Sequence, residues 1–439
     1  MKGVRDNKTL LSRIAVVIYW IIILGLFVLF FTNDFGLVDI HKTSIITAVG
    51  IDCPEDEVLV TAEVAVPQPS QSGENIKYMQ VQGSGLTIAD AMSEINAKTG
   101  FYPKLQFCKL ILVGESCRDN ELFRVLGCFY RKNYSELTAL VAMCKGNASD
   151  MLAMKSDDSD MTSESIRNIL SDEIEKSANA NSANLKSIAA LQYSQSAACY
   201  MPYVEAFKPG TSENGGNGEN VGGENADGGQ NGSGGSGGGS GEQGGSGSGG
   251  GEGGQSGSGG QSQSGGGQGE PVEFLARRTA YFADGRFKGI LDERQSFALA
   301  VIENDIRLAV LPCDAANGIH YTLGLKDVNA GAKLDIADGA PVLTFKFKAN
   351  AQIQGARVKM DPDKIHEDDV VPKEVIEGAE LALKERMTAL FETCKRDKAD
   401  LLGLREQLYK KSAGYFEAYK DDLLDRTQIR FEIDIKSAS

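Results

Sequence analysis

Apolar residues recur at spacings typical of strands and helices in two stretches of the chain, residues 40–207 and 272–437. In the first stretch, runs rich in β-branched residues at Ile45–Ile51 and Val58–Val66 predict two strands. Further runs predict strands at Leu110–Val113, Leu137–Cys144 and Tyr200–Phe207, and helices at Leu122–Tyr130, Ser149–Lys155 and Glu164–Ser171. The polar residues from there to Ala197 give no clear prediction. This alternation of strands and helices indicates one or two α/β domains.

A further helix of this stretch is predicted to begin at Thr87. The sequence Thr87-Ile88-Ala89-Asp90 resembles a capping box, and Ile88, Ala91, Met92 and Ile95 fall on one helical face. The preceding Gly83-Ser84-Gly85 has two glycines but lacks the remainder of a phosphate-binding loop. We therefore interpret it as the turn that leads into the helix.

The second stretch has the clearest strand pattern in the chain. Apolar residues from Leu343 to Ile353 alternate with Lys, Thr, Asn and Gln, which predicts a half-buried strand. Val371–Asp397 repeats apolar residues every three or four positions and predicts a long amphipathic helix. We expect strands also at Arg278–Phe282, Ile306–Pro312 and Ile429–Ile435, and helices at Leu401–Tyr409 and Ala413–Leu423. This stretch is therefore also predicted to be α/β, with a predominantly antiparallel sheet.

The residues between the two stretches have a different composition. Thirty of the 51 glycines lie in residues 209–270, among Ser, Gln, Asn and Glu and without Lys or Arg. A segment of such low hydrophobicity cannot bury enough apolar surface to fold. We predict a disordered Gly/Ser-rich linker at 209–270 that separates two folding segments.

The N-terminus carries an apolar run without charged residues, Ile14–Phe31. Eighteen helical residues span about 27 Å, close to the thickness of a hydrocarbon core. No small-residue cleavage site follows, which favours a retained transmembrane helix at 14–33 over a cleaved signal peptide. Basic residues precede the run and Asp34 and Asp39 follow it. The positive-inside rule then makes residues 1–13 a cytoplasmic basic tail and the rest a membrane-anchored ectodomain.

The charge balance excludes one class of partner. The formal net charge is −15, from 60 acidic and 45 basic residues. A nucleic-acid-binding protein needs a basic surface that releases counterions, so we expect no nucleic acid as a partner.

Eight cysteines follow the apolar run: Cys53, Cys108, Cys117, Cys128, Cys144, Cys199, Cys313 and Cys394. Disulfides are one interpretation in an oxidising compartment. Most of these residues, however, lie inside apolar runs, and no C-x-x-C pair or metal-like spacing occurs. We favour buried thiols that behave as small hydrophobic side chains.

Candidate chemistry is sparse. The three histidines His41, His320 and His366 lie in separate regions, and none belongs to a metal-ligand motif. Acidic clusters occur at Asp157–Asp160 and between Asp361 and Asp369, but both lack the spacing of a calcium loop. They are best read as solvated loops, and they are the only feature that favours an extracellular enzyme. We predict no catalytic, cofactor-binding or metal-binding residues and no cofactor.

A colinear set of segments resembles the GerAC-type spore germination proteins. Ser44–Cys53 (SIITAVGIDC) and Val60–Ser70 (VTAEVAVPQPS) are similar to the opening of that family. The order of similar segments continues through Leu86–Ser116, Gly127–Leu152, Arg278–Leu299, Val310–Cys313 and Ala399–Tyr409. The family normally begins with a lipoprotein signal, whereas this chain has its apolar run there. The sequence therefore resembles a divergent member with a transmembrane anchor.

This resemblance implies a fold and a function. The fold would be a membrane-anchored ectodomain of about three mixed-sheet α/β domains, interrupted by the long Gly-rich insertion. The resemblance implies that this insertion is an expanded surface loop whose flanking halves pack together. The function would be that of a non-enzymatic C subunit of a nutrient germinant receptor, working with integral membrane A and B subunits in the spore inner membrane or the cell membrane. The alternative is a membrane-tethered envelope scaffold or adhesion module that reuses the fold.

Overall fold

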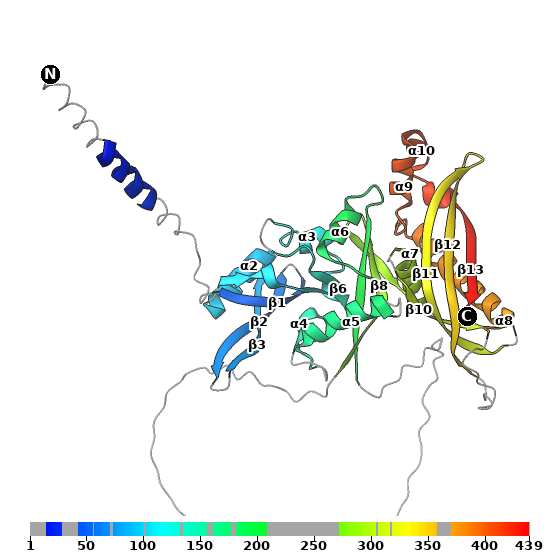
Figure 1. Ribbon diagram of the computed structural model, residues 1–439, viewed down its shortest axis with the longest axis horizontal. Helices are drawn as coiled ribbons and strands as arrows, with labels where there is room; N and C mark the ends of the chain where they lie inside the picture. The colour runs from blue at the N-terminus through cyan, green and yellow to red at the C-terminus, as the bar shows by residue number, and fades with distance from the viewer. Residues whose placement is uncertain are drawn as a thin grey trace, which may run out of the picture. The chain divides into compact units, whose positions relative to one another are not determined.

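The structure is a computed structural model (Figure 1). It describes residues 15–28, 43–55, 57–70, 73–100, 102–131, 135–155, 161–176, 181–208, 272–303, 306–316, 318–357 and 370–438. The predicted cytoplasmic tail 1–13, the predicted linker 209–270, both acidic clusters, His41 and His366 lie outside these residues. The chain before and the chain after the Gly-rich segment belong to one compact unit.

Nine strands of the described chain form a mixed sheet. Their bounds are β1 Thr43–Asp52, β2 Val58–Ser70, β3 Gly73–Gly85, β4 Tyr102–Lys104, β5 Leu110–Gly114, β6 Leu140–Cys144, β7 Ala198–Phe207, β8 Glu273–Ala283 and β9 Arg286–Leu291. The order across the sheet is β3-β2-β1-β5-β6-β7-β8-β9, with β4 paired to β1. Strands β1, β5, β6 and β7 run parallel, whereas the pairs at both ends are antiparallel.

Helices cover both faces of this sheet because its central strands are apolar on both sides. Along β5, Ile111 and Val113 face one core, while Leu110 and Leu112 face another, as the two-residue period of a strand requires. The first core also holds side chains of α2 Ile88–Thr99, α3 Leu122–Leu126 and α6 Leu185–Gln192. The second holds those of α4 Ala148–Ala153 and α5 Thr162–Lys176. The expected α/β class with mixed sheets is confirmed.

A second sheet of four described strands lies in the C-terminal part. It consists of β10 Leu308–Asp314, β11 His320–Ala337, β12 Ala340–Ala356 and β13 Gln428–Ser437, in that order. β10, β11 and β12 pair antiparallel, and β13 adds at the edge parallel to β12, so the predicted predominantly antiparallel sheet is confirmed. The long helix α8 Lys373–Arg396 covers one face of it together with α7 Glu293–Glu303 (Figure 1). The remaining helices are α9 Leu404–Lys411, α10 Ala413–Tyr419 and α11 Leu423–Arg426.

The two sides of residues 209–270 are joined within the first sheet. β7 and β8 pair antiparallel from Ala198 opposite Ala283 to Phe207 opposite Glu273. Tyr200 of β7 and Tyr281 of β8 also enter the apolar core that contains α7 and α8. β8 therefore completes the sheet begun by the first stretch and shares the core of the second, and the two halves pack together as expected.

Most predicted elements are confirmed, some with different bounds. The helix predicted at Leu122–Tyr130 ends at Leu126, and the stretch without a prediction contains α6. The elements that were not predicted include β3, β4, β9, β11, α6 and α7. Helix α7 buries six consecutive residues from Ser296 to Val301, so this part of the helix shows no helical periodicity to detect.

The predicted capping box at Thr87 is confirmed. Thr87 Oγ1 accepts a hydrogen bond from the Asp90 N–H at 3.2 Å, and Asp90 accepts one from the Thr87 N–H at 3.1 Å. The N–H of Ser84 donates to Glu94 in α2, and hydrogen bonds from Lys98 and from this N–H lower the pKa of Glu94 to about 2. Gly83, Ser84 and Gly85 are the last residues of β3 and pair with β2, so our interpretation of them as a turn is wrong. The Ser84 donor is occupied by a carboxylate, as expected if the segment is not a phosphate loop.

Residues 15–28, within the predicted transmembrane segment, form a helix with exposed side chains. Within the described ranges, none of the helices combines the length and the apolar character that a membrane span requires.

Gly83 provides a direct test of the close contact between β3 and α2. A Cβ at this position would collide with the carbonyl oxygen of Ala91 and lie 2.9 Å from Ile95 Cγ1. We expect Gly83→Ala to lower the free energy of unfolding of the full chain by about 1–3 kcal/mol, measured by urea titration in detergent. The matched control is Gly331→Ala in β11, where a Cβ meets nothing within 4 Å, with an expected change below about 0.5 kcal/mol. Equal effects of the two substitutions would contradict the packing described here.

Candidate functional site

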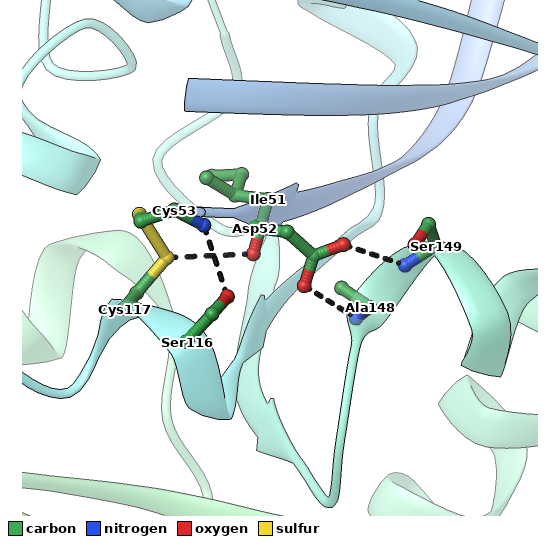
Figure 2. Close-up of a disulfide and its surroundings, with 7 residues drawn as sticks. All are labelled: Ile51, Asp52, Cys53, Ser116, Cys117, Ala148 and Ser149. Atoms are coloured by element: carbon green, nitrogen blue, oxygen red, sulfur yellow. Dashed lines mark hydrogen bonds between the residues drawn. A yellow bond between two sulfur atoms is a disulfide. The ribbon is translucent and has the colours of Figure 1, made fainter. Parts of the chain in front are cut away.

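Polar residues follow three parallel strands of the first sheet where they end at a common edge. Asp52 and Cys53 lie at the end of β1, Glu115 follows β5, and Lys145 and Gly146 follow β6. In α/β sheets the carboxyl ends of the strands are the usual place for a ligand. Figure 2 shows the part of this edge around Asp52 and Cys53.

Asp52 holds the first turn of α4. Its Oδ1 accepts a hydrogen bond from the N–H of Ala148 at 2.7 Å, and its Oδ2 accepts one from the N–H of Ser149 at 2.9 Å (Figure 2). The N-cap residue Asn147 makes no side-chain capping bond itself. A carboxylate from another strand therefore satisfies the first N–H groups of the helix and interacts favourably with its dipole.

Gly114, the last residue of β5, leaves the space for this carboxylate. A Cβ there would collide with Asp52 Oδ1 and lie 3.1 Å from the backbone nitrogen of Ala148. The glycine is thus explained by the close approach of Asp52, which is 3% exposed, and not by a turn.

A disulfide closes the same edge beside Asp52. Cys53 is bonded to Cys117, which ends the short 3-10 helix η3 Glu115–Cys117, and the Cys53 N–H donates to Ser116 Oγ at 3.0 Å (Figure 2). Our prediction of thiols is wrong for these two residues. It is confirmed for the buried thiols Cys108, Cys144, Cys199, Cys313 and Cys394. Burial raises the pKa of the Cys108 thiol to about 12, which keeps it protonated and unreactive.

Glu115 links three strands at this edge. It accepts hydrogen bonds from the Tyr203 hydroxyl of β7 at 2.5 Å and from the Gly146 N–H at 3.1 Å, and it forms an ion pair with Arg118. Burial alone would raise the pKa of Glu115, but the Tyr203 and Gly146 bonds and the Arg118 charge outweigh it, and the pKa lies below its ordinary value. The guanidinium of Arg118 also lies over the Phe287 ring of β9, 5.0 Å from its centre.

Glu205 extends the network toward β8. It is 9% exposed and pairs with Lys145 at 3.2 Å and with Arg278 at 3.8 Å. Arg278, which follows the Gly-rich segment in the chain, also lies over the Tyr203 ring at 5.6 Å. Residues from both family-like stretches therefore meet along this edge.

These carboxylates are engaged in holding the backbone together. Asp52 binds two N–H groups, Glu115 binds a hydroxyl, an N–H and a guanidinium, and Glu205 binds two cations. Among the described residues, no group of three or more His, Cys, Asp or Glu side chains could hold a metal ion. These bonds fix the ends of the strands and the start of α4 relative to one another.

His320, the described histidine among the candidates from the sequence, does not lie at the carboxyl edge of the first sheet. His320 Nδ1 lies 2.7 Å from Asp314 Oδ1 near the start of β11. His320 also lines a cavity of about 460 Å³ beside α8. A smaller cavity of about 210 Å³ lies near Thr47, Lys109 and Arg167. Neither lining includes Asp52, Glu115 or Glu205.

The sequence analysis did not predict that these residues meet at one edge of the sheet, although the sequence contains a signal for it. Asp52-Cys53 and Glu115-Ser116-Cys117 each follow directly on an apolar strand. Because the carboxyl ends of parallel strands meet at one edge, this placement could have suggested the disulfide. The signal depends on knowing that the two strands are parallel neighbours, which the hydrophobic pattern does not state.

Comparisons with known proteins match the chain on both sides of the Gly-rich segment. Residues 37–206 match the family model described as spore germination protein N-terminal domain, and residues 277–438 match the model described as spore germination B3/GerAC like, C-terminal. No curated protein matches the sequence. The crystal structure of the GerBC protein superposes with a TM-score of 0.47 and 15% sequence identity, covering 91% of this chain and all of that chain.

The Glu115 network predicts a defined pH dependence of stability. Its pKa is lower in the folded chain than in the unfolded chain, so its contribution is present above the unfolded pKa of about 4.3 and is lost as the pH falls through the folded pKa. We expect Glu115→Gln to cost about 2 kcal/mol of unfolding free energy at pH 7 and progressively less below about pH 4. Urea titrations at several pH values measure this.

The control for that experiment is Glu392→Gln on α8. Glu392 is exposed and pairs with Lys395 at 3.7 Å, and this pair is expected to contribute less than about 0.5 kcal/mol. A cost at Glu115 that does not change between pH 7 and pH 3 would show that its charge is not what stabilises the edge.

The disulfide assignment predicts the thiol count of the chain. Denatured but unreduced protein should give six reactive thiols, and reduced protein eight. Closing a loop with a sequence separation of 64 residues is expected to stabilise the fold by about 4 kcal/mol, so reduction should lower the urea midpoint. Eight thiols before reduction would contradict the pairing of Cys53 with Cys117.

Proposed function

The chain belongs to the GerAC-type family of spore germination proteins, and on this premise we propose that it is a non-enzymatic, membrane-anchored subunit of a spore germinant receptor. The observation that carries the proposal is the match of both family models, in order, on the two sides of residues 209–270. Together the matched ranges cover both sheets apart from the end of β7 and the first residues of β8.

The geometry at the carboxyl edge of the first sheet supports a role without catalysis. The edge of the first sheet, where an α/β enzyme commonly binds its substrate, is filled by carboxylates that bind backbone N–H groups, a tyrosine and arginines. A rigid edge of this kind suits a subunit that presents a fixed surface to partners.

We propose that residues 14–33 anchor this ectodomain in a single-pass manner, with residues 1–13 in the cytoplasm. The uncharged run Ile14–Phe31 and the basic residues before it support this orientation. An anchor raises the effective concentration of the ectodomain near membrane partners. The partners we propose are the integral membrane A and B subunits of the receptor, in the spore inner membrane or the cell membrane.

We also retain the organisation expected from the sequence. Residues 40–207 and 272–437 would be the family-like regions, and 209–270 a linker that adds length without a fold of its own. No residue is proposed for catalysis, for a cofactor or for a metal.

Deletion of the coding sequence in the sporulating host tests the proposed function. Spores of the deletion strain should form in normal numbers but fail to germinate in response to at least one nutrient. Germination is measured as the loss of optical density after the nutrient is added. Complementation with the wild-type chain or with Gly331→Ala should restore the response, because that position has open space around it. A normal response of the deletion strain to every nutrient that triggers its parent would overturn the proposal and favour an envelope scaffold.

A further inference from the structure

A cavity of about 460 Å³ lies between α8, the end of β10 and the start of α7. This size is within the range of small-molecule sites. Its lining includes Asp292, Arg294, Pro312, Glu385 and Arg386. None of these residues takes part in the network at the carboxyl edge of the first sheet.

The sequence of α8 explains why the space exists. Gly378 packs directly on β10, where a Cβ would collide with the carbonyl oxygen of Asp314. One and three turns further along the same helix, Ala382 and Ala389 are too small to fill the gap that opens toward α7. The cavity thus begins at the close contact of Gly378 with β10 and continues along α8 past the short side chains of Ala382 and Ala389.

Arg386 is a buried cation at this cavity. The residue is 9% exposed, and the structure gives its guanidinium one hydrogen bond, from Nη2 to the carbonyl oxygen of Pro312 at 3.3 Å. The group also lies 4.8 Å from the centre of the Phe297 ring. No carboxylate of the described residues forms an ion pair with it. Burying a charge without a counter-ion is unfavourable, so an anion at this position would be stabilised.

A second cation points to the same ligand chemistry. Arg294 lines the cavity from the first turn of α7, and it too forms no ion pair among the described residues. Burial first, and then repulsion from Arg294, lower the pKa of Arg386 to about 10. Both effects would be relieved by an anion between the two guanidinium groups.

The rest of the lining limits the charge of the ligand. Asp292, Asp314 and Glu385 also line the cavity. Asp314 interacts with His320, whereas Glu385 is exposed and forms no ion pair among the described residues. Three carboxylates disfavour a doubly charged ion such as phosphate, and the Pro312 and alanine surfaces can contact carbon.

We propose that this cavity binds a small organic acid whose single carboxylate pairs with Arg386 and Arg294. The guanidinium fork of Arg386 matches a carboxylate in geometry and charge. The acidic side chains of the lining can accept hydrogen bonds from a hydroxyl or amine of the same ligand. This assignment goes beyond the proposed function and does not rest on it.

The competing explanation is that Arg386 only connects α8 to β10 through Pro312 and Phe297. That role requires no ligand, and it predicts that substitution of Arg386 changes stability alone. Binding measurements on a folded variant separate the two explanations.

The test uses the full chain in detergent micelles, with lactate as the probe and lactamide as its uncharged counterpart. Calorimetric titration should give a dissociation constant for lactate of about 1 mM, with lactamide at least tenfold weaker. Arg386→Gln should weaken lactate binding at least tenfold. Lys384→Gln removes a partly exposed cation on the same helix and outside the lining, and it should leave lactate binding unchanged.

Arg294→Gln keeps the experiment decisive if Arg386→Gln does not fold, because Arg294 is exposed and its loss should not disturb the core. It should weaken lactate binding several-fold, with an unchanged circular dichroism spectrum. The proposal is overturned if acetate, lactate and benzoate all fail to bind at up to about 100 mM. It is also overturned if a folded variant of either arginine binds lactate as the wild type does, or if phosphate binds more tightly than every monocarboxylate.

Discussion

The antiparallel pairing of β7 with β8 is the interaction on which the rest of the structure depends. It joins the chain before the Gly-rich segment to the chain after it, from Ala198 opposite Ala283 to Phe207 opposite Glu273. β8 then carries β9 in the first sheet and contributes Tyr281 and Ala283 to the core under the second sheet. Around this strand pair, Ser196 Oγ donates to Asp400 at 2.6 Å, and the Gln195 N–H donates to Glu406 at 2.9 Å. These contacts tie the turn before β7 to the residues that follow α8.

This arrangement explains why so long a Gly-rich segment is tolerated. Each doubling of a flexible loop adds only about 0.6 kcal/mol to the cost of closing it. The backbone ladder of β7 and β8 and the buried side chains on both of its faces offset a penalty of that size. A long connection between β7 and β8 is therefore compatible with one compact unit.

The carboxyl edge of the first sheet fixes the other end of the same body. Asp52 caps α4, the disulfide joins β1 to the residues after β5, and Glu115 and Glu205 bind partners from β6, β7 and β8. These carboxylates could suggest acid–base chemistry, but their hydrogen bonds and ion pairs hold neighbouring elements together. The buried cation Arg386, in contrast, is left without an acidic partner among the described residues, and this difference directs attention to the cavity beside α8.

Hydrophobic periodicity predicted the elements whose two faces differ. The alternating strand β12, the amphipathic helix α8 and the capped helix at Thr87 are examples. It failed for α7, which buries six consecutive residues from Ser296 to Val301. It also failed for β11, a long strand whose pairing with β12 shifts register between Lys326 and Asn329. The joint at Asp52, Cys53 and Glu115 could not be predicted because it depends on which strands are neighbours, and the same holds for the pocket of Arg386. The family resemblance supplied the order of the segments but not their contacts.

Cleavage within residues 209–270 is the measurement that tests most directly whether the two halves form one body. A recognition site for a sequence-specific protease is inserted there, and the cleaved full chain is purified through a tag at its C-terminus. The single disulfide of the described chain lies within the first fragment, so it cannot hold the fragments together. The pairing of β7 with β8 predicts that both fragments remain associated in size-exclusion chromatography until urea unfolds them. Separation of intact, folded fragments without denaturant would contradict it.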